Sequence, residues 1–117
     1  MDNKRSSERK GLKVFLKVFD EMTDQLFGYL VDISNEGIMV TREQGVEIDS
    51  DFQLRVVLPA EIEGKKESRF STQSRWSEKD SETEFFNAGF QFVDLSPSDK
   101  MIIKRLMQNF CFDTDTE

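Results

Sequence analysis

The sequence predicts an all-β fold, a small antiparallel barrel or sandwich followed by one C-terminal helix. Short stretches alternate apolar with polar residues, as half-buried strands do. Turn-forming residues separate these stretches, and one amphipathic helical pattern follows the last of them. A chain of 117 residues can bury one ordinary core. We therefore expect a single domain without internal repeats.

The first strand is expected at residues 12–19, where every second residue is apolar: Leu12, Val14, Leu16 and Val18. Lysines occupy positions between them, so this apolar side should face the core. Before this strand, residues 1–11 are polar and basic, and we expect a flexible arm that hinges at Gly11.

The remaining strands follow at short intervals, and residues 12–96 together form the predicted β domain. Strands are expected at 26–33, 38–40, 52–58, 70–76 and 85–93. Pro59 should end the fourth strand, because proline lacks the backbone N–H that a sheet requires. The charged stretch 60–67 is then expected to be an exposed connector. Of the adjacent pair Phe85 and Phe86, one side chain must face away from the core, where it could contact another protein.

The helix is expected at residues 97–110. Ser96 can cap it, Pro97 suits its first position, and Asp99 completes a capping box. Apolar residues then recur at three- and four-residue spacing: Ile102, Ile103, Leu106, Met107 and Phe110. Such a stripe packs on its own domain or, alternatively, binds a partner. Residues 111–117 are expected to be a frayed acidic tail.

Charge is distributed unevenly along the chain. The net charge is −7, but residues 1–17 carry +4 and the other hundred carry −11. An acidic body repels a long polyanion, whereas a short basic arm can hold a small one. The distribution therefore disfavours general DNA or RNA binding. The alternative is that the basic arm is merely solvated.

Catalysis and metal binding are not expected. The chain has no His and one Cys, which excludes a Ser-His triad and most zinc sites. No glycine-rich GxxxxGK[ST] phosphate loop is present. We therefore expect no enzyme, no catalytic residue and no cofactor. The apolar runs are too short for membrane insertion and no secretion signal is visible, so a cytoplasmic location is expected.

Two short motifs carry the functional signal. The first is Arg5-Ser-Ser-Glu-Arg9, an RxxxR pattern, and the second is Asp32-Ile-Ser34-Asn-Glu-Gly37, a DxSxxG pattern. In order and spacing they resemble the signatures of the PilZ domain, a bacterial receptor module for cyclic di-GMP. The chain also resembles this family in ending with Gly89-Phe-Gln-Phe-Val93 before the helix. The resemblance implies a six-stranded antiparallel barrel with a C-terminal helix.

The resemblance also implies the binding residues Arg5, Arg9, Asp32, Ser34 and Gly37. Arginine can pair bidentately with phosphate or with the O6/N7 edge of guanine. Asp32 and Ser34 share one face of an extended segment, where Asp32 can accept from guanine N–H groups and Ser34 can donate or accept. Gly37 would permit a positive φ or a close approach to ligand. Taken alone, residues 32–37 would be more simply explained as an Asx or Ser turn between two strands, and the pairing with Arg5 and Arg9 favours the binding interpretation.

Two further residues are weaker candidates. Trp76 could stack on a guanine, although a lone Trp in a short strand is usually core. Lys4 precedes the first motif arginine, and in similar domains this position influences whether one ligand or a stacked pair is bound. A cation there favours two ligands, since it can offset the second ligand's phosphates.

The implied function is that of a cyclic di-GMP receptor or adaptor, whose basic arm folds over the ligand and signals to an unidentified effector protein. One rival is a PilZ-like interaction module in motility or pilus machinery that binds no ligand. The other is an unrelated small barrel that binds protein or nucleic acid, and the acidic body argues against nucleic acid.

Overall fold

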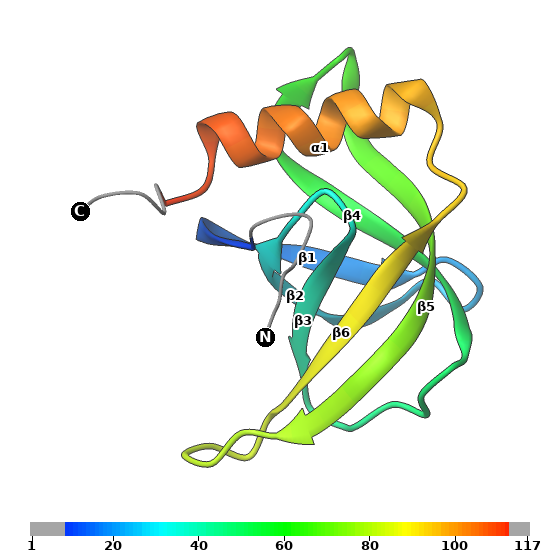
Figure 1. Ribbon diagram of the computed structural model, residues 1–117, viewed down its shortest axis with the longest axis vertical. Helices are drawn as coiled ribbons and strands as arrows, with labels where there is room; N and C mark the ends of the chain where they lie inside the picture. The colour runs from blue at the N-terminus through cyan, green and yellow to red at the C-terminus, as the bar shows by residue number, and fades with distance from the viewer. Residues whose placement is uncertain (1–8, 113–117) are drawn as a thin grey trace, which may run out of the picture.

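The computed structural model describes residues 9–112 and consists of six β-strands and one α-helix (Figure 1). The elements are β1 (Lys10–Asp20), β2 (Gln25–Ile33), β3 (Gly37–Arg42), β4 (Asp51–Ile62), β5 (Lys65–Lys79), β6 (Phe86–Val93) and α1 (Pro97–Asn109). In Figure 1, α1 crosses one end of the sheet, and the loop between β5 and β6 extends from the other end.

The strands form a closed barrel in the order β1-β2-β3-β6-β5-β4, with every neighbouring pair antiparallel. The predicted all-β fold, six-stranded barrel and C-terminal helix are confirmed. The shortest paired segment is the one between β1 and β4, which closes the barrel and runs only from Val18 to Asp20 of β1. The strand interiors supply most of the core, including Leu30, Val40, Leu54 and Phe70, each at most 2% exposed.

Helix α1 covers one end of this core. Its capping box is formed as predicted: Ser96 Oγ accepts from the backbone N–H of Asp99, and the Asp99 carboxylate accepts from the backbone N–H of Ser96. Ile102, Ile103 and Leu106 are at most 1% exposed. The apolar stripe therefore packs on its own barrel. Within residues 9–112, no helix is long and apolar enough to cross a membrane.

The prediction that Val14 faces the core is wrong, because its side chain is 57% exposed. The pairing of β1 with β2 shifts register between Gly11 and Leu16. A bulge of this kind breaks the two-residue alternation, so Leu12 and Leu16 stay inside while Val14 turns outward.

The expected end of the fourth strand at Pro59, and the connector after it, are also wrong. β4 continues to Ile62, which is buried, and β5 starts at Lys65, so the charged stretch is a hairpin. Pro59 is tolerated because it lies in the gap between the paired residues Val57 and Ile62, where the register shifts. Gly64 forms the turn at a φ of 77°.

Both ends of the described chain are more ordered than predicted. Gly11 belongs to β1, pairs with Asp32 and accepts a hydrogen bond from the backbone N–H of Phe112 at 2.9 Å. The Lys13 N–H donates to the Phe110 carbonyl at 2.9 Å. Gly11 is therefore not a hinge, and the strand begins two residues inside the predicted arm. The predicted tail likewise starts with residues that pair with β1.

Candidate ligand-binding site

A recess of about 210 Å³ lies where the turn between β2 and β3 meets β5 and β6. It is lined by Arg9, Ser34, Glu36, Gly37, Arg75, Trp76, Gly89, Phe90 and Gln91. Four of the residues predicted from sequence are among them, from both motifs and from β5. Residues 9 and 34–37 are far apart in the chain, and the barrel brings them together. Arg5 and Lys4 lie outside the described residues.

Ser34 shapes the turn from within. Its side chain is buried, and its Oγ accepts from the backbone N–H groups of Glu36 at 3.1 Å and Gly37 at 3.2 Å. The Ser34 N–H in turn donates to the Gly37 carbonyl at 2.9 Å. The hydroxyl is thus already engaged, and Ser34 stabilises the turn instead of presenting a free polar group to the recess.

Gly37 is required by the packing of β3 against β6. A Cβ at this position would overlap the carbonyl of Phe90, because Gly37 pairs with Gln91 across a close approach of the two backbones. Its φ is not positive; among the described glycines, only Gly64 has a positive φ. The structure therefore shows a close approach of Gly37 to β6, and the predicted close approach to a ligand stays a prediction.

Arg9 and Asp32 form an ion pair, with Arg9 Nε 3.8 Å from Asp32 Oδ1. The Asp32 side chain is 17% exposed and its Oδ1 is buried, with no hydrogen-bond donor among residues 9–112. Burial raises the pKa of Asp32, and the positive charge of Arg9 partly opposes this shift. Asp32 does not line the recess itself. It adjoins the recess through Arg9, and its Oδ1 is an acceptor that no donor within the described residues uses.

Trp76 forms one wall of the recess. It follows a register shift between Ser74 and Trp76 in the pairing of β5 with β6, and it is half-buried. It pairs with Gly89, where a Cβ would overlap the indole. Trp76 therefore lies on the surface of β6 at the recess and is not part of the buried core.

The sequence analysis missed Arg75, Gln91 and Glu36. Arg75 is exposed, donates from Nη1 to Gln73 Oε1 at 2.9 Å and lies 3.9 Å from an Asp49 carboxylate oxygen. It faces the recess because the bulge in β5 interrupts the alternation of its side chains. In the sequence, only its position directly before Trp76 could have pointed to Arg75, because a cation next to an aromatic residue is a common combination in nucleotide sites.

The side chains in and beside the recess are of the types that contact an anion and stack on a nucleobase. They include guanidinium groups, a buried carboxylate nearby and an aromatic wall. No group of three or more His, Cys, Asp or Glu side chains within residues 9–112 is arranged to hold a metal ion.

Several solved structures share this fold. The chain is similar to the Bacillus subtilis inhibitor of motility MotI/DgrA, with a TM-score of 0.71 and 17% identity, over 92% of this chain and 51% of that one. It is similar to the PilZ domain of Escherichia coli YcgR with c-di-GMP, with a TM-score of 0.69 and 15% identity, over 92% of both chains. A complex of MrkH from K. pneumonia with c-di-GMP gives a TM-score of 0.73 and 13% identity, over 92% of this chain and 52% of that one.

The chain thus spans about half the length of MotI/DgrA and MrkH. No curated protein sequence matched it. At these identities the structural similarity shows the fold. The PilZ domain model matches residues 3–109, nearly the whole chain, and the chain belongs to the PilZ domain family.

Proposed function

We propose that this protein is a cyclic di-GMP receptor that passes ligand occupancy to a partner protein. The observation that supports it most is the convergence of Arg9, the turn at Ser34–Gly37 and Trp76 on one recess, with Asp32 beside Arg9. Two structural neighbours, YcgR and MrkH, are complexes with c-di-GMP.

Three residues in or beside the recess match parts of this ligand. The Arg9 guanidinium can pair with a phosphate or with guanine O6 and N7. Asp32 Oδ1, buried and lacking a donor among the described residues, can accept from guanine N1–H and N2–H. Trp76 offers a ring face for stacking. A bound nucleotide would supply donors to Asp32 Oδ1, which has none within residues 9–112, and would cover the exposed guanidinium of Arg9.

The recess is small for a whole dinucleotide. Its volume of about 210 Å³ is below the roughly 300–1,000 Å³ of typical small-molecule pockets. The proposed site is therefore completed by the arm that carries Arg5 and Lys4. Lys10 and Gly11 are paired with β2 and would not take part in this movement. Closing the arm over the ligand would create the surface that a partner protein recognises.

A second candidate is a protein-interaction module that binds no ligand. It is favoured by the structural roles of Ser34 and Gly37, because turn formation and packing against β6 explain both residue types without a ligand. The ion pair of Arg9 with Asp32 leaves Asp32 Oδ1 without a hydrogen-bond donor among residues 9–112, so we place the receptor function first. Neither candidate involves catalysis.

Calorimetric titration of the full chain with cyclic di-GMP, and with GTP as the control nucleotide, tests the proposal. We expect saturable binding of micromolar affinity or tighter for cyclic di-GMP only. A stoichiometry of two ligands per chain would support the role of Lys4, and a drop to one ligand in Lys4→Leu would confirm it. No heat of binding with cyclic di-GMP would favour the ligand-free module.

A further inference from the structure

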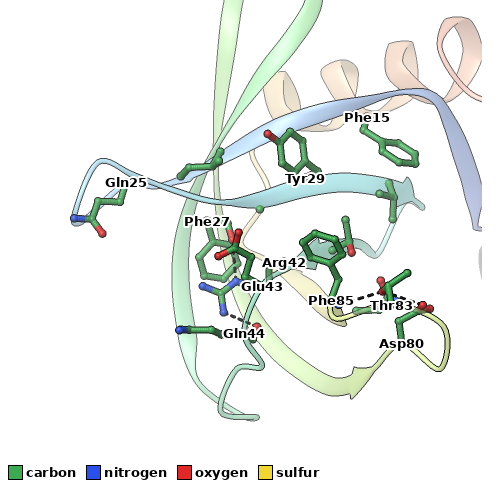
Figure 2. A pocket seen from close by; sticks show the side chains of 15 residues that line it. Phe15, Gln25, Phe27, Tyr29, Arg42, Glu43, Gln44, Asp80, Thr83 and Phe85 are labelled. Carbon is green, nitrogen blue, oxygen red and sulfur yellow. Dashed lines mark hydrogen bonds between the residues drawn. The ribbon is translucent and has the colours of Figure 1, made fainter.

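A second and larger hollow, of about 1,080 Å³, lies over β2 and β3 beside the β5–β6 loop, and it shares no lining residue with the recess (Figure 2). Its walls come from β1, β2, β3 and the β5–β6 loop. We call it the outer groove and define it by Phe15, Leu26, Tyr29, Val31 and Phe85, together with the polar residues around them. Those are Gln25, Arg42, Glu43, Gln44, Asp80, Thr83 and Asn87.

The apolar residues of the outer groove are unusually open to solvent. Phe15 is 59% exposed, Leu26 49% and Phe85 45%. Phe15 lies in the same bulge of β1 that turns Val14 outward. In Figure 2, Phe15 and Tyr29 project from β1 and β2, and Phe85 points from its loop back toward these strands. A gathered apolar surface of this kind marks an interaction site more often than scattered exposed residues do.

The exposure of Phe85 is imposed by the loop that carries it. The Asp80 N–H donates to the Phe85 carbonyl at 2.9 Å, and the Phe85 N–H donates to Thr83 Oγ1 at 3.1 Å. Asp80 Oδ2 also accepts from Thr83 Oγ1 at 3.0 Å and from the Glu82 N–H at 3.1 Å. The backbone that carries the aromatic ring is therefore held in place before any partner arrives, which lowers the entropic cost of binding.

The polar groups around the groove favour a basic partner. Glu43 and the loop residues Asp80, Glu82 and Glu84 supply four carboxylates, and three of these residues are exposed. Two cations on the β3 and loop side are engaged by the protein's own carbonyl groups: Arg42 with those of Phe27, Gln44 and Gly45, and Lys79 with that of Thr83. Lys17, which pairs with Tyr29, is exposed on the β1 side, so the acidic side of the groove is the one formed by Glu43 and the β5–β6 loop. The Arg42 guanidinium also lies 4.1 Å from the centre of the Phe27 ring.

The floor of the groove restricts how a partner can bind. β2 is paired with β1 and β3, and β3 is paired with β2 and β6, so neither strand offers a free edge for an added strand. Recognition must then use side chains, as when an amphipathic helix lies in an apolar groove.

We propose that the outer groove docks an amphipathic helix of a partner protein, with its apolar face on Phe15, Tyr29 and Phe85 and with Lys or Arg beside the Glu43 and Asp80–Glu84 carboxylates. A second copy of this chain is disfavoured, because the hundred residues after position 17 carry −11. The inference rests on the proposed adaptor role. It names the surface that the partner would use, on the same two strands that lead into the β2–β3 turn.

The test uses an 18-residue synthetic peptide with Leu and Phe on one helical face and Lys on the other. The comparison peptides are one with Glu in place of every Lys and one with the same composition in scrambled order. We expect the Lys peptide to bind the full chain saturably and at least about tenfold more tightly than either comparison peptide. Phe15→Ser and Phe85→Ala should each weaken binding at least about fivefold.

Two further variants separate groove contacts from general effects. Met101→Ser removes an exposed apolar side chain on α1, away from the groove, and should leave peptide affinity unchanged. Glu43→Gln with Glu82→Gln should weaken binding of the Lys peptide at low salt without affecting folding. The inference is overturned if the Lys peptide does not bind, if the scrambled peptide binds equally, or if Phe15→Ser with Phe85→Ala leaves affinity unchanged. It is also overturned if light scattering shows a dimer that Phe85→Ala dissociates.

Titration of the same variants with cyclic di-GMP distinguishes this inference from the proposed function. Phe15→Ser and Phe85→Ala should bind the nucleotide as the unmodified chain does, because neither residue lines the recess. Nucleotide binding without peptide binding overturns the groove alone. Peptide binding at the groove without nucleotide binding supports the groove and overturns the receptor function.

Discussion

The indole of Trp76 fills the space that a side chain at Gly89 would need. The two residues pair across β5 and β6 just after a bulge, so the absence of a Cβ at Gly89 lets the indole lie against β6 at the recess. The aromatic wall of the proposed site thus depends on a glycine in the neighbouring strand. Overlap with a rigid ring cannot be relieved by a small side-chain movement.

Gly89→Ala should therefore displace Trp76 and lower the free energy of unfolding by about 1–3 kcal/mol. Trp76 is the single tryptophan of the chain, so its fluorescence emission reports the displacement directly. Gly11→Ala is the matched control, because a Cβ there would be in ordinary contact, 3.9 Å from the Phe112 ring. An unchanged emission spectrum in Gly89→Ala would contradict the packing described here.

Ser34→Ala should destabilise the fold as well as the site. The substitution removes the acceptor of two backbone N–H groups in a partly buried turn, at a cost of about 1–3 kcal/mol. Urea denaturation measures the loss. Ser34→Thr, which keeps the hydroxyl, should recover part of it. If Ser34→Ala retained full stability, the turn would not depend on this hydroxyl, and a ligand contact would become the better explanation of the serine.

The sequence predicted the strands and the helix because the signals involved are local, whereas the choice of a barrel over a sandwich came from the family resemblance. Alternation identifies a strand from its own residues, and Ser96 with Asp99 identifies a helix start within four positions. The errors fall where another strand decides the geometry. The Val14 side chain faces solvent because the pairing of β1 with β2 shifts register around it. Pro59 is tolerated because β4 is not paired with β5 at that position.

In the candidate site, too, local motifs were predictable and contacts between strands were not. The motif positions were predicted, but the roles of Ser34 and Gly37 depend on how near β3 comes to β6, which no motif specifies. Arg75 was missed because only the bulge in β5 turns it toward the recess. The ion pair between Arg9 and Asp32 combines one residue from each motif, and its distance follows from the barrel.

Asp32→Asn should raise stability at neutral pH in the absence of ligand. Burial raises the pKa of Asp32 in the folded protein above its usual 3.8, so the ionised carboxylate costs folding free energy. The unmodified chain should lose stability as pH rises from about 3.8 to the raised folded value, and the difference between the two proteins should disappear below this window. Denaturant titrations at pH 3.5, 5 and 7 measure the difference.

Glu21 supplies a control of opposite sign for this pH experiment. Hydrogen bonds from Arg69 and Arg55 lower the pKa of Glu21, so its contribution is present above its unfolded pKa and is lost as pH falls through the folded value. Glu21→Gln should therefore reduce stability at neutral pH. A stabilising Glu21→Gln or a destabilising Asp32→Asn would mean that the charges act differently from the described contacts.

Leu106→Ala should cost about 2–5 kcal/mol of stability, because Leu106 is fully buried between α1 and the barrel. Chemical denaturation checks this value. Met101→Ala lies on the same helix but is 40% exposed, and its effect should stay within about 0.5 kcal/mol. Similar losses in the two variants would contradict burial as the cause of the difference, because Ala is a stronger helix former than either Leu or Met.

Arg9→Ala should weaken binding of cyclic di-GMP by at least about 1.5 kcal/mol, roughly tenfold in affinity, because it removes a charge-assisted contact. We expect the same of Arg5→Ala, on the other arginine of the motif. Arg9→Lys should also weaken binding, since an ammonium group keeps the charge but loses the planar fork.

Lys17→Ala is the control for this charge series, because it removes an exposed cation of β1 that does not line the recess. Calorimetry at constant ionic strength gives the affinities. If Arg5→Ala with Arg9→Ala bound the ligand as tightly as the unmodified chain, the arginines would not form the site. If Arg9→Lys bound as tightly, charge alone would suffice, and the bidentate pairing proposed for Arg9 would be wrong.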